Sequence, residues 1–377
     1  MYKLEVHSNR NNSGWDISQL AYDIQYTTSL DGNPGKLTFS LKKDPTGGLF
    51  LECGYCVTFQ IITNEITENV FTGYIFTMST GRKDNYKITA YDSLRYLKNH
   101  DSFVLKDGEK SLNEVFEEIC RSWKIKYKNE LIELGDLSDF ALPQHVFNDV
   151  TLFDILSWCM QRTETGDFSI FKGNSLIAQT IKGNKEYDAG LDDGYFGRKY
   201  FLKDKNGILT LTEVALEGQN NPVIIGTESL LTDYQYELSI DKDTYNDITL
   251  VQDSKVENEG GKKKSKRKQA VAEKADEETI KRWGRLNKTI TIKEGANQQQ
   301  IEEYVNLTLQ NYNRITKTLK LNAIGYSLYA GSSFILDLEK IGMTCRCYVL
   351  TATHNYKANI HTMTLEVTTN PKLLEVL

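Results

Sequence analysis

The segments Arg346-Cys347-Tyr348-Val349-Leu350-Thr351-Ala352 and His361-Thr362-Met363-Thr364-Leu365-Glu366-Val367 lie near the end of this 377-residue chain. Together with 318–321 and 334–338 they predict a series of short strands. The stretch at about 297–312 has the spacing of an amphipathic helix, with one face formed by Ile301, Tyr304, Val305, Thr308 and Tyr312. The last hundred residues therefore indicate a β-domain with a helix packed on it. Because they contain no evident catalytic constellation, they favour an assembly protein over an enzyme.

Residues 1–97 have the pattern of half-buried strands. Leu37, Phe39 and Leu41 alternate with polar residues, and the same period of two recurs at 57–61 and 86–90. Turn-forming residues precede and separate these runs, as in Asp31-Gly32-Asn33-Pro34-Gly35 and Asp44-Pro45-Thr46-Gly47-Gly48. A small barrel or a strongly curled sheet would bury such strands, so we predict an N-terminal β-barrel-like domain at 1–97.

The pattern changes to helical spacing after residue 97. Ser111 and Glu114 have the spacing of a capping box, and apolar residues then recur on one helical face as far as Trp123. A second helix is predicted from near Thr151, with Asp154 in its first turn. Short strand patterns follow this helix. These features predict a small α+β domain at 98–228.

A third domain is predicted at 229–377, with strands that begin near residues 234 and 247. Within it, the run Lys262-Lys263-Lys264-Ser265-Lys266-Arg267-Lys268 is flanked on both sides by acidic residues. Such a segment buries too little apolar surface to offset the entropy of ordering it, so we expect a charged mobile insert at about 253–278. The predicted fold class is a multidomain, β-rich α+β protein.

The composition is that of an ordinary globular protein with two or three domains. The chain is 40% hydrophobic and 25% charged, with a net charge of -6, and an acidic balance argues against a general nucleic-acid binder. The N-terminus lacks an apolar signal core, and no stretch approaches the roughly 18–20 apolar residues of a membrane span. We therefore expect synthesis in the cytoplasm and no membrane anchoring. Six cysteines fit reduced thiols better than a disulfide framework.

The cysteines and histidines do not form a chemical motif in a suitable context. Cys53 and Cys56 have C-x-x-C spacing, and Cys345 with Cys347 forms a second pair, but both pairs lie in strand-like sequence, whereas redox motifs begin a helix. The five histidines have no metalloprotease spacing, and no phosphate-binding glycine motif occurs. We expect no cofactor, no metal and no catalytic residue. A metal or redox role for the cysteine pairs and a Cys-His hydrolase are the alternatives.

The candidate residues for partner contact lie in and after the charged segment. A basic run could grip nucleic acid or anionic lipid, although a run bracketed by acids is more often a solvated loop. Trp283 could anchor a partner, since tryptophan is common at binding hot spots, or it could pack in a core or at an edge. The candidate contact residues are Trp283, Arg282, Lys262, Lys263, Lys264, Lys266, Arg267 and Lys268.

Several short segments occur in an order that resembles one family. They are Ala90-Tyr91-Asp92-Ser93-Leu94-Arg95-Tyr96-Leu97, Val150-Thr151-Leu152-Phe153-Asp154-Ile155-Leu156, Tyr245-Asn246-Asp247-Ile248-Thr249-Leu250-Val251, Ile280-Lys281-Arg282-Trp283-Gly284, Asn313-Arg314 followed by Thr318-Leu319-Lys320-Leu321, and His354 with 361–367. In this order and spacing they resemble the baseplate hub proteins of contractile phage tails and phage-like bacteriocins, especially the XkdQ-type hubs of Gram-positive prophages. The resemblance spans nearly the whole chain, and the Lys-rich insert departs from it.

The resemblance implies a structural role in a particle. Family hubs are trimers whose chains each carry two tail-tube-like β-barrel domains, with the small α+β domain between them. Three chains then present six modules to a hexameric tube and receive a trimeric spike, which makes the hub a symmetry adapter. The implied partners are a homotrimer of this chain, the central spike protein, the tail tube protein, the tape measure protein and a baseplate wedge or LysM-type baseplate protein. DNA is only passing cargo if the particle is a phage.

The resemblance also implies a location and leaves two other functions open. The implied location is the bacterial cytoplasm during assembly, followed by the baseplate of a phage tail or bacteriocin particle. The first alternative is a tail-associated peptidoglycan hydrolase, although neither an appended hydrolase domain nor a recognisable triad is present. The second is a nucleic-acid-binding protein that acts through the Lys-rich insert.

Overall fold

The computed structural model divides the chain into two compact units. Unit 1 comprises Met1–Gln235 and Leu319–Leu377, and unit 2 comprises Tyr236–Thr318. The structure describes residues 2–11, 13–42, 44, 48–63, 67–81, 85–130, 141–165, 200–213, 223–241, 244–256, 265–292, 298–339, 342–357 and 360–369.

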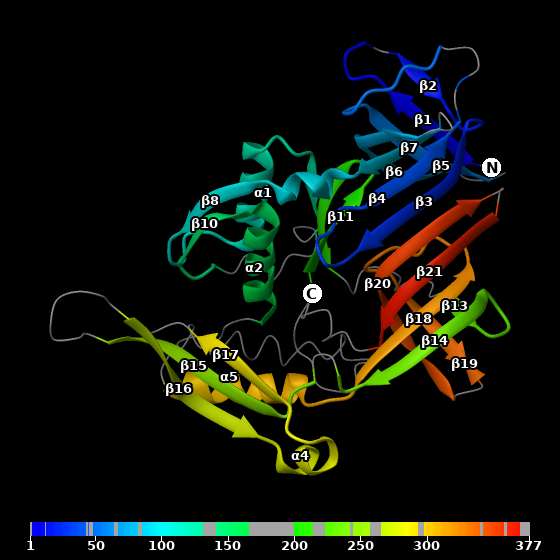
Figure 1. The fold of residues 1–377 in the computed structure, drawn as a ribbon. Helices are drawn as coiled ribbons and strands as arrows, with labels where there is room; N and C mark the ends of the chain where they lie inside the picture. Colours follow the sequence, from blue (N-terminus) through cyan, green and yellow to red (C-terminus); the bar gives the residue numbers. More distant parts are fainter. Residues whose placement is uncertain are drawn as a thin grey trace. The chain divides into compact units, whose positions relative to one another are not determined.

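The N-terminal strands of unit 1 form the first β-block (Figure 1). Its spatial order is β3-β4-β7-β6-β5-β1-β2, and neighbouring strands are antiparallel. Leu37, Phe39 and Leu41 of β4 are buried, as their period of two predicts. The strands are β1 (Tyr2–His7), β2 (Gly14–Asp16), β3 (Ala21–Ser29), β4 (Lys36–Leu41), β5 (Cys56–Ile62), β6 (Thr67–Thr80) and β7 (Tyr86–Tyr91).

Strands from the C-terminal half of the chain form the second β-block, and two of them, β14 and β18, run a few residues into unit 2. Its spatial order is β14-β18-β21-β20-β19-β13. Phe334 and Leu336 of β19 and Leu365 of β21 are buried in its core. The strands are β13 (Ile224–Gly226), β14 (Leu231–Ser239), β18 (Thr316–Ile324), β19 (Ser333–Leu338), β20 (Met343–Lys357) and β21 (Ile360–Thr368).

The two β-blocks share one strand order. Strands β3, β4, β5, β6 and β7 of the first block correspond to β14, β18, β19, β20 and β21 of the second, because both blocks place these five strands in the same spatial sequence. Their first strands differ, since β1 is antiparallel to β5 whereas β13 is parallel to β19. Strand β3 pairs with β20 and so joins both blocks into one sheet of 13 strands.

A small α+β region lies between the blocks in the sequence. Helices α1 (Leu112–Ser122) and α2 (Leu152–Thr165) share one apolar core with β11 and β12. The predicted capping box is confirmed, because Ser111 accepts from the main chain of Glu114 and the Glu114 side chain accepts from Ser111. The other elements are the 3₁₀ helix η1 (Ser93–Lys98), β8 (His100–Leu105), β9 (Tyr127–Asn129), β10 (His145–Thr151), β11 (Tyr200–Lys205) and β12 (Ile208–Glu213).

The sheet and helices of unit 2 lie in the connection between β14 and β18. Strand β15 (Asp247–Val256) pairs antiparallel with β16 (Ser265–Ala275) and parallel with β17 (Asn287–Ile292). Helix α5 (Gln298–Tyr312) packs on this sheet, where Ile301, Val305 and Leu309 share a core with Ile248 and Leu250. Helix α4 (Glu277–Trp283) begins at Asp276, whose carboxylate accepts from the main-chain N–H of Thr279.

The β-rich α+β class predicted from the sequence is confirmed, but the structure divides the chain differently from the predicted domains 1–97, 98–228 and 229–377. The C-terminal strands join the sheet of the N-terminal strands, because β20 hydrogen-bonds β3, and only 236–318 separates as a unit. That each β-block is a tail-tube-like barrel stays a prediction.

Regular structure covers most of the predicted mobile insert at about 253–278. Residues 253–256 and 265–275 belong to the β15–β16 hairpin, and α4 follows. Two paired strands supply main-chain hydrogen bonds to each other, and this contribution does not depend on buried apolar surface. Within the described residues, none of the helices combines the length and apolar composition that a bilayer crossing requires.

Candidate functional site at the seam between the β-blocks

The seam between β3 and β20 joins residues that are 322 to 330 positions apart in the sequence. On one face the amide of Gln25 donates to Asn355 Oδ1 at 2.9 Å. Beside it, the hydroxyls of Thr27 and Thr353 lie 3.3 Å apart, and Ser29 pairs with Thr351 at the same distance. This ladder of neutral polar side chains fixes the register without burying a charge.

Aromatic side chains fill the other face of the seam. Tyr26 of β3 is buried against Phe71, with 5.5 Å between ring centroids, and against Tyr329 at 5.9 Å. The ring of His354 in β20 lies 6.5 Å from that of Tyr26 and 4.9 Å from that of Tyr329. These contacts are far apart in the chain, so the aromatic cluster holds one block to the other.

His354 is a buried neutral histidine. Burial, reinforced by the neighbouring His361, lowers the pKa of His354 to about 4. Its Nε2 lies 2.9 Å from the carbonyl oxygen of Leu328, which can only accept, so Nε2 carries the proton. Nδ1 then accepts from Nε2–H of His361 at 3.0 Å. Both ring nitrogens are occupied, so His354 has a structural role in the seam.

Glu68 at the start of β6 makes a second connection between the blocks. Its carboxylate accepts from the hydroxyl of Ser327 at 2.7 Å and from that of Tyr329 at 3.1 Å. Both donors lie in the loop that leads to β19. A carboxylate with two hydroxyl donors is a strong acceptor, and here it ties this loop to the first β-block.

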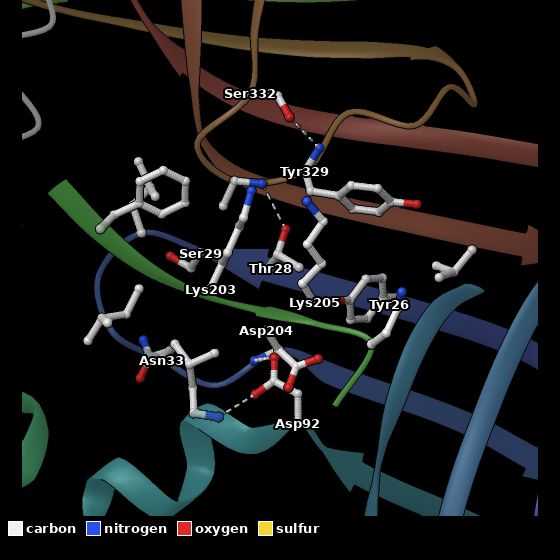
Figure 2. Close-up of a pocket in the computed structure, with 18 of the residues that line it drawn as sticks. Tyr26, Thr28, Ser29, Asn33, Asp92, Lys203, Asp204, Lys205, Tyr329 and Ser332 are labelled. Atoms are coloured by element: carbon white, nitrogen blue, oxygen red, sulfur yellow. Dashed lines mark hydrogen bonds between the residues drawn. The ribbon is translucent and has the colours of Figure 1, made fainter. Parts of the chain in front are cut away.

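A cavity of about 220 Å³ lies beside the seam, and Figure 2 shows the carboxyl groups of Asp92 and Asp204 together in it. Burial raises the pKa of Asp92 well above its usual range, and the nearby Asp204 raises it further. Burial also raises the pKa of Asp204. The two carboxyl groups therefore hold protons to higher pH than exposed aspartates do.

All four carboxyl oxygens of this pair accept main-chain hydrogen bonds. Asp92 accepts from the N–H of Gly35 at 2.9 Å and from that of Leu94 at 3.1 Å. Asp204 accepts from the N–H of Ser93 at 3.2 Å and from that of Gly207 at 2.8 Å. The pair thus anchors the β3–β4 turn, η1 and β11 to one another. An acid–base role would compete with these bonds.

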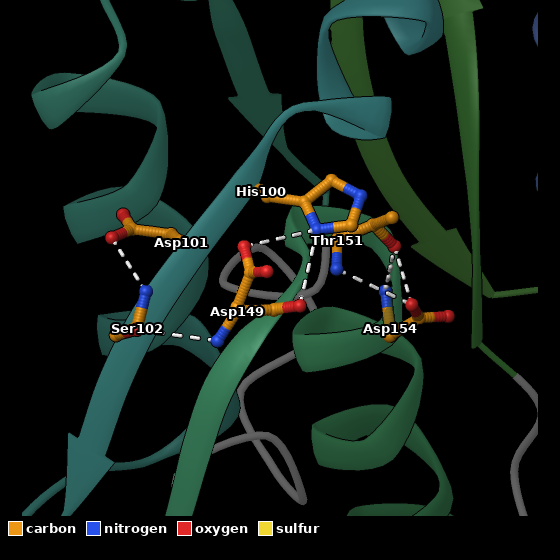
Figure 3. A network of polar contacts seen from close by, with 6 residues as sticks. All are labelled: His100, Asp101, Ser102, Asp149, Thr151 and Asp154. Atoms are coloured by element: carbon orange, nitrogen blue, oxygen red, sulfur yellow. Dashed lines mark hydrogen bonds and ion pairs between the residues drawn. The ribbon is translucent and has the colours of Figure 1, made fainter.

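A second polar cluster lies where β10 leads into α2 (Figure 3). Thr151 donates its hydroxyl to Asp154 at 2.6 Å and accepts from the Asp154 main chain at 3.1 Å, which is a helix cap. His100 Nδ1 lies 3.1 Å from the carbonyl oxygen and 3.3 Å from the carboxylate of Asp149. Asp149 has a φ of 50° and lies at a bulge of β10. Capping and the bulge account for the cluster.

The predicted partner-contact residues lie on separate elements of unit 2. Trp283 ends α4 and is partly exposed, and the guanidinium of Arg282 lies 5.7 Å from its ring centre. Lys266, Arg267 and Lys268 lie in β16, where they are opposite Lys255, Ser254 and Asp253 of β15. Lys262, Lys263 and Lys264 lie outside the described residues. A contact role for all of these residues stays a prediction.

The cysteine pairs lie in the strand context that the sequence indicated. Cys53 is exposed in the turn before β5, and Cys56 begins that strand. Cys345 and Cys347 lie on β20 with their sulfur atoms 4.0 Å apart, and burial raises the pKa of Cys347. Among the residues that the structure describes, no group of three or more His, Cys, Asp or Glu side chains could hold a metal ion.

The seam has a sequence signal that periodicity alone does not reveal. The stretch Asp23-Ile24-Gln25-Tyr26-Thr27-Thr28-Ser29-Leu30-Asp31 recurs as Asp233-Tyr234-Gln235-Tyr236-Glu237-Leu238-Ser239-Ile240-Asp241. The first copy contains most of β3 and the second most of β14. Alignment of the chain with itself can therefore reveal the repeated β-block from the amino-acid sequence alone.

The chain is similar in sequence to one protein family and to two proteins of Bacillus subtilis (strain 168). The family model described as YQBQ-like matches residues 24–368. The phage-like element PBSX protein XkdQ of Bacillus subtilis (strain 168) is 23% identical over 303 residues, which are 80% of this chain and 78% of that protein. The uncharacterized protein YqbQ of the same strain is 24% identical over 305 residues, with 80% and 78% covered.

Solved structures of tail proteins have a similar fold. The 43 kDa tail protein of prophage MuSo2 from Shewanella oneidensis has a TM-score of 0.60 at 12% identity, over 97% of this chain and 98% of that one. The tail protein from Neisseria meningitidis MC58 has a TM-score of 0.60 at 11% identity, over 99% and 98%. At these identities the similarity concerns the fold alone.

Proposed function

The chain belongs to the YQBQ-like family, and from that premise we propose that it is a structural component of a phage-type tail and not an enzyme. Its relative XkdQ comes from a phage-like element, and the two tail proteins of similar fold support the same class of particle. More specifically, we propose the hub of a contractile-tail baseplate: a homotrimer that adapts the hexameric tail tube to the trimeric central spike.

The observation that carries this proposal is the repeated β-block. One chain contains two blocks with the same order of five strands, joined side by side through β3 and β20. Three such chains would present six similar blocks around a threefold axis. A ring of this kind can meet six tube subunits at one end and three spike chains at the other, which is the task of a symmetry adapter.

The proposed partners are those of such a hub. Besides two further copies of the chain, they are the spike, tube and tape measure proteins and a baseplate wedge or LysM-type baseplate protein. The proposed location is the bacterial cytoplasm during assembly and then the baseplate of a phage tail or bacteriocin, where DNA would be passing cargo only.

Co-expression with the spike and tube proteins of the same particle tests the proposal. We expect the tagged chain to co-purify with both, with three copies of the chain for each spike trimer by native mass spectrometry. An equally tagged unrelated protein of similar mass is the control. Failure of both proteins to co-purify, while each is soluble and folded, would contradict the hub role.

Zymography on purified cell walls separates the hub from the hydrolase alternative. The hub role predicts no clearing band at the position of this chain, with a known muramidase as the positive control. A band that persists through purification would contradict the non-enzymatic assignment.

A further inference from the structure

The two β-blocks are equivalent residue by residue around their longest strands. In the first block Phe76 of β6 is a bulge, because Ile75 pairs with Ala90 and Thr77 with Thr89 of β7. In the second block Leu350 of β20 is the corresponding bulge, between the pairs Val349–Val367 and Thr351–Glu366. The flanking sequences match, with Tyr74-Ile75-Phe76-Thr77-Met78-Ser79-Thr80 against Tyr348-Val349-Leu350-Thr351-Ala352-Thr353-His354. A bulge is a specific feature, so a shared one fixes the alignment of the two strands.

The turns that precede β5 and β19 confirm this alignment. The N–H of Gly54 donates to the carbonyl of Ile75 at 2.7 Å, and the N–H of Gly331 donates to Val349 at 2.9 Å. Both glycines have a left-handed φ, 91° and 88°. Equivalent main-chain bonds at equivalent glycines show that the repeat extends to backbone geometry.

The edges of β3 and β14 are aligned in the same way. The N–H of Lys42 donates to the carbonyl of Leu20 at 3.0 Å, and the N–H of Ile324 donates to Leu230 at 2.8 Å. The sequence repeat of 23–31 at 233–241 keeps the same offset of 210 residues. Strand β14 is therefore the counterpart of β3, with Tyr236 in the place of Tyr26.

The repeat leaves two complementary edges open. In the first block the outer edge of β3 is covered by β20 of the same chain. Its counterpart β14 ends the sheet, and among the described residues no strand pairs with its outer edge. The counterpart of the β20 edge is β6 beyond Ile75, which pairs with β7 on one side and, within the described part of the chain, with no strand on the other.

The side chains at these open edges are more exposed than their counterparts in the seam. Tyr26 is 5% exposed in the seam, whereas Tyr236 is only partly buried. Leu238 of β14 is 56% exposed and Phe76 of β6 is 36% exposed. Open strand edges with apolar side chains are templates for pairing with another chain, so two matching edges on one molecule suit a second copy of it.

We propose that β14 of one copy pairs antiparallel with 77–80 of β6 in the next copy, in the register that β3 and β20 have within one chain. This inference rests on the proposed homotrimer and names its interface. Thr351 lies opposite Ser29 and Thr353 opposite Thr27 in the seam. The repeat therefore places Thr77 opposite Ser239 and Ser79 opposite Glu237 between copies.

A main-chain bond at the end of the seam extends the same register. The N–H of Leu30 donates to the carbonyl of the bulge residue Leu350 at 3.0 Å. The corresponding bond between copies runs from Ile240 N–H to the carbonyl of Phe76. Each copy then contributes its β14 edge to one neighbour and its β6 edge to the other, which is a head-to-tail contact. Three copies that repeat this contact close into a ring in which neither edge is left unpaired.

Cysteine cross-linking tests the pairing. The full-length chain with Glu237→Cys and Ser79→Cys, oxidised under native conditions, should yield disulfide-linked dimers and trimers on non-reducing gels. The variant with Thr27→Cys and Thr353→Cys is the matched positive control, because the seam brings these positions together within one chain, and it should cross-link without a gain in mass. Thr232→Cys with Ser79→Cys is the negative control, since Thr232 lies at the other end of β14.

The outcomes separate this inference from the proposed function. Linked dimers and trimers from the Glu237/Ser79 pair, absent from each single variant, support the strand pairing. A native trimer that forms no such cross-link, while the seam control does, overturns the pairing and leaves the hub role standing. A chain that stays monomeric at all concentrations and with its spike overturns both. The single variants also measure any background from the exposed native Cys53.

Discussion

At the residue scale, the seam owes its pH response to one buried histidine. Burial lowers the pKa of His354 to about 4, while the unfolded chain titrates near pH 6.5, so the unfolded state binds protons first as the pH falls. The stability that neutral His354 supports is present above pH 6.5 and is lost as the pH falls towards 4. The groups that face its ring are Tyr26, Tyr329, Tyr356 and His361, with Glu68 beyond them.

Urea unfolding between pH 7 and pH 4 measures this effect. We expect the wild type to lose on the order of 3 kcal/mol through His354 over this range, and His354→Gln to have a smaller slope with pH. His100→Gln is the matched control, because His100 has a 56% exposed side chain outside the seam. Equal slopes for wild type and His354→Gln would contradict a neutral, buried His354.

The aspartate pair should change the stability of the fold with pH in the opposite direction to His354. The pKa of Asp92 is raised in the folded state, so its carboxyl group keeps a proton to higher pH there. In the unfolded chain the same carboxyl group loses its proton near pH 4. Stability from this group therefore declines as the pH rises from about 4 through the raised pKa. Asp92→Asn should flatten this part of the stability curve, even if it lowers stability overall by losing one main-chain acceptor. A curve parallel to that of the wild type would argue against the raised pKa.

At the scale of elements, the repeat supplies a matched pair of glycines. Gly54 and Gly331 hold equivalent turns with positive φ, but a Cβ at Gly331 would lie 2.3 Å from the ring of Phe201, whereas a Cβ at Gly54 would meet nothing within 4 Å. Gly54→Ala should lower the free energy of unfolding by about 1 kcal/mol through backbone strain alone. Gly331→Ala should cost about 2–4 kcal/mol, since overlap with a buried ring adds to the strain. If chemical denaturation gave the same loss of unfolding free energy for both variants, the ring of Phe201 would have to move aside without a cost, which would contradict this prediction.

Much of the local structure could be predicted from the sequence, because local patterns encode it. The alternation in β4 and the capping box at Ser111 each depend on neighbours within a few residues, and both predictions are confirmed. The pairing of β3 with β20 could not be predicted in this way, because it depends on residues more than 300 positions apart. The carboxyl pair of Asp92 and Asp204 was missed for the same reason, since each aspartate alone has the sequence context of an ordinary turn residue.

The β15–β16 hairpin shows the limit of composition as a guide. A run of lysines indicates a solvated segment, and that expectation is sound for a single strand in water. Paired strands satisfy their main-chain groups whatever their side chains are, so charge alone does not exclude strand structure.

At the scale of the whole molecule, unit 2 is an insertion in the second block. In the first block a short turn at 30–35 joins β3 to β4, whereas the equivalent strands β14 and β18 are separated by unit 2. A chain in which residues 242–317 are replaced by the sequence Gly32-Asn33-Pro34-Gly35 should therefore retain the 13-stranded sheet and unfold cooperatively. Replacement by Gly-Ser-Gly-Ser is the matched control for turn chemistry. Aggregation of both variants during expression would contradict the insertion.

The central claim is that three copies of a chain with two equivalent β-blocks make one ring, and its most direct test is the mass of the native assembly. Multi-angle light scattering on the purified full-length chain, alone and with its spike protein, gives this mass without reference to shape. We expect three times the chain mass of 43.1 kDa, with the spike mass added in the second case. A mass of 43.1 kDa under both conditions, at every concentration, would contradict the ring.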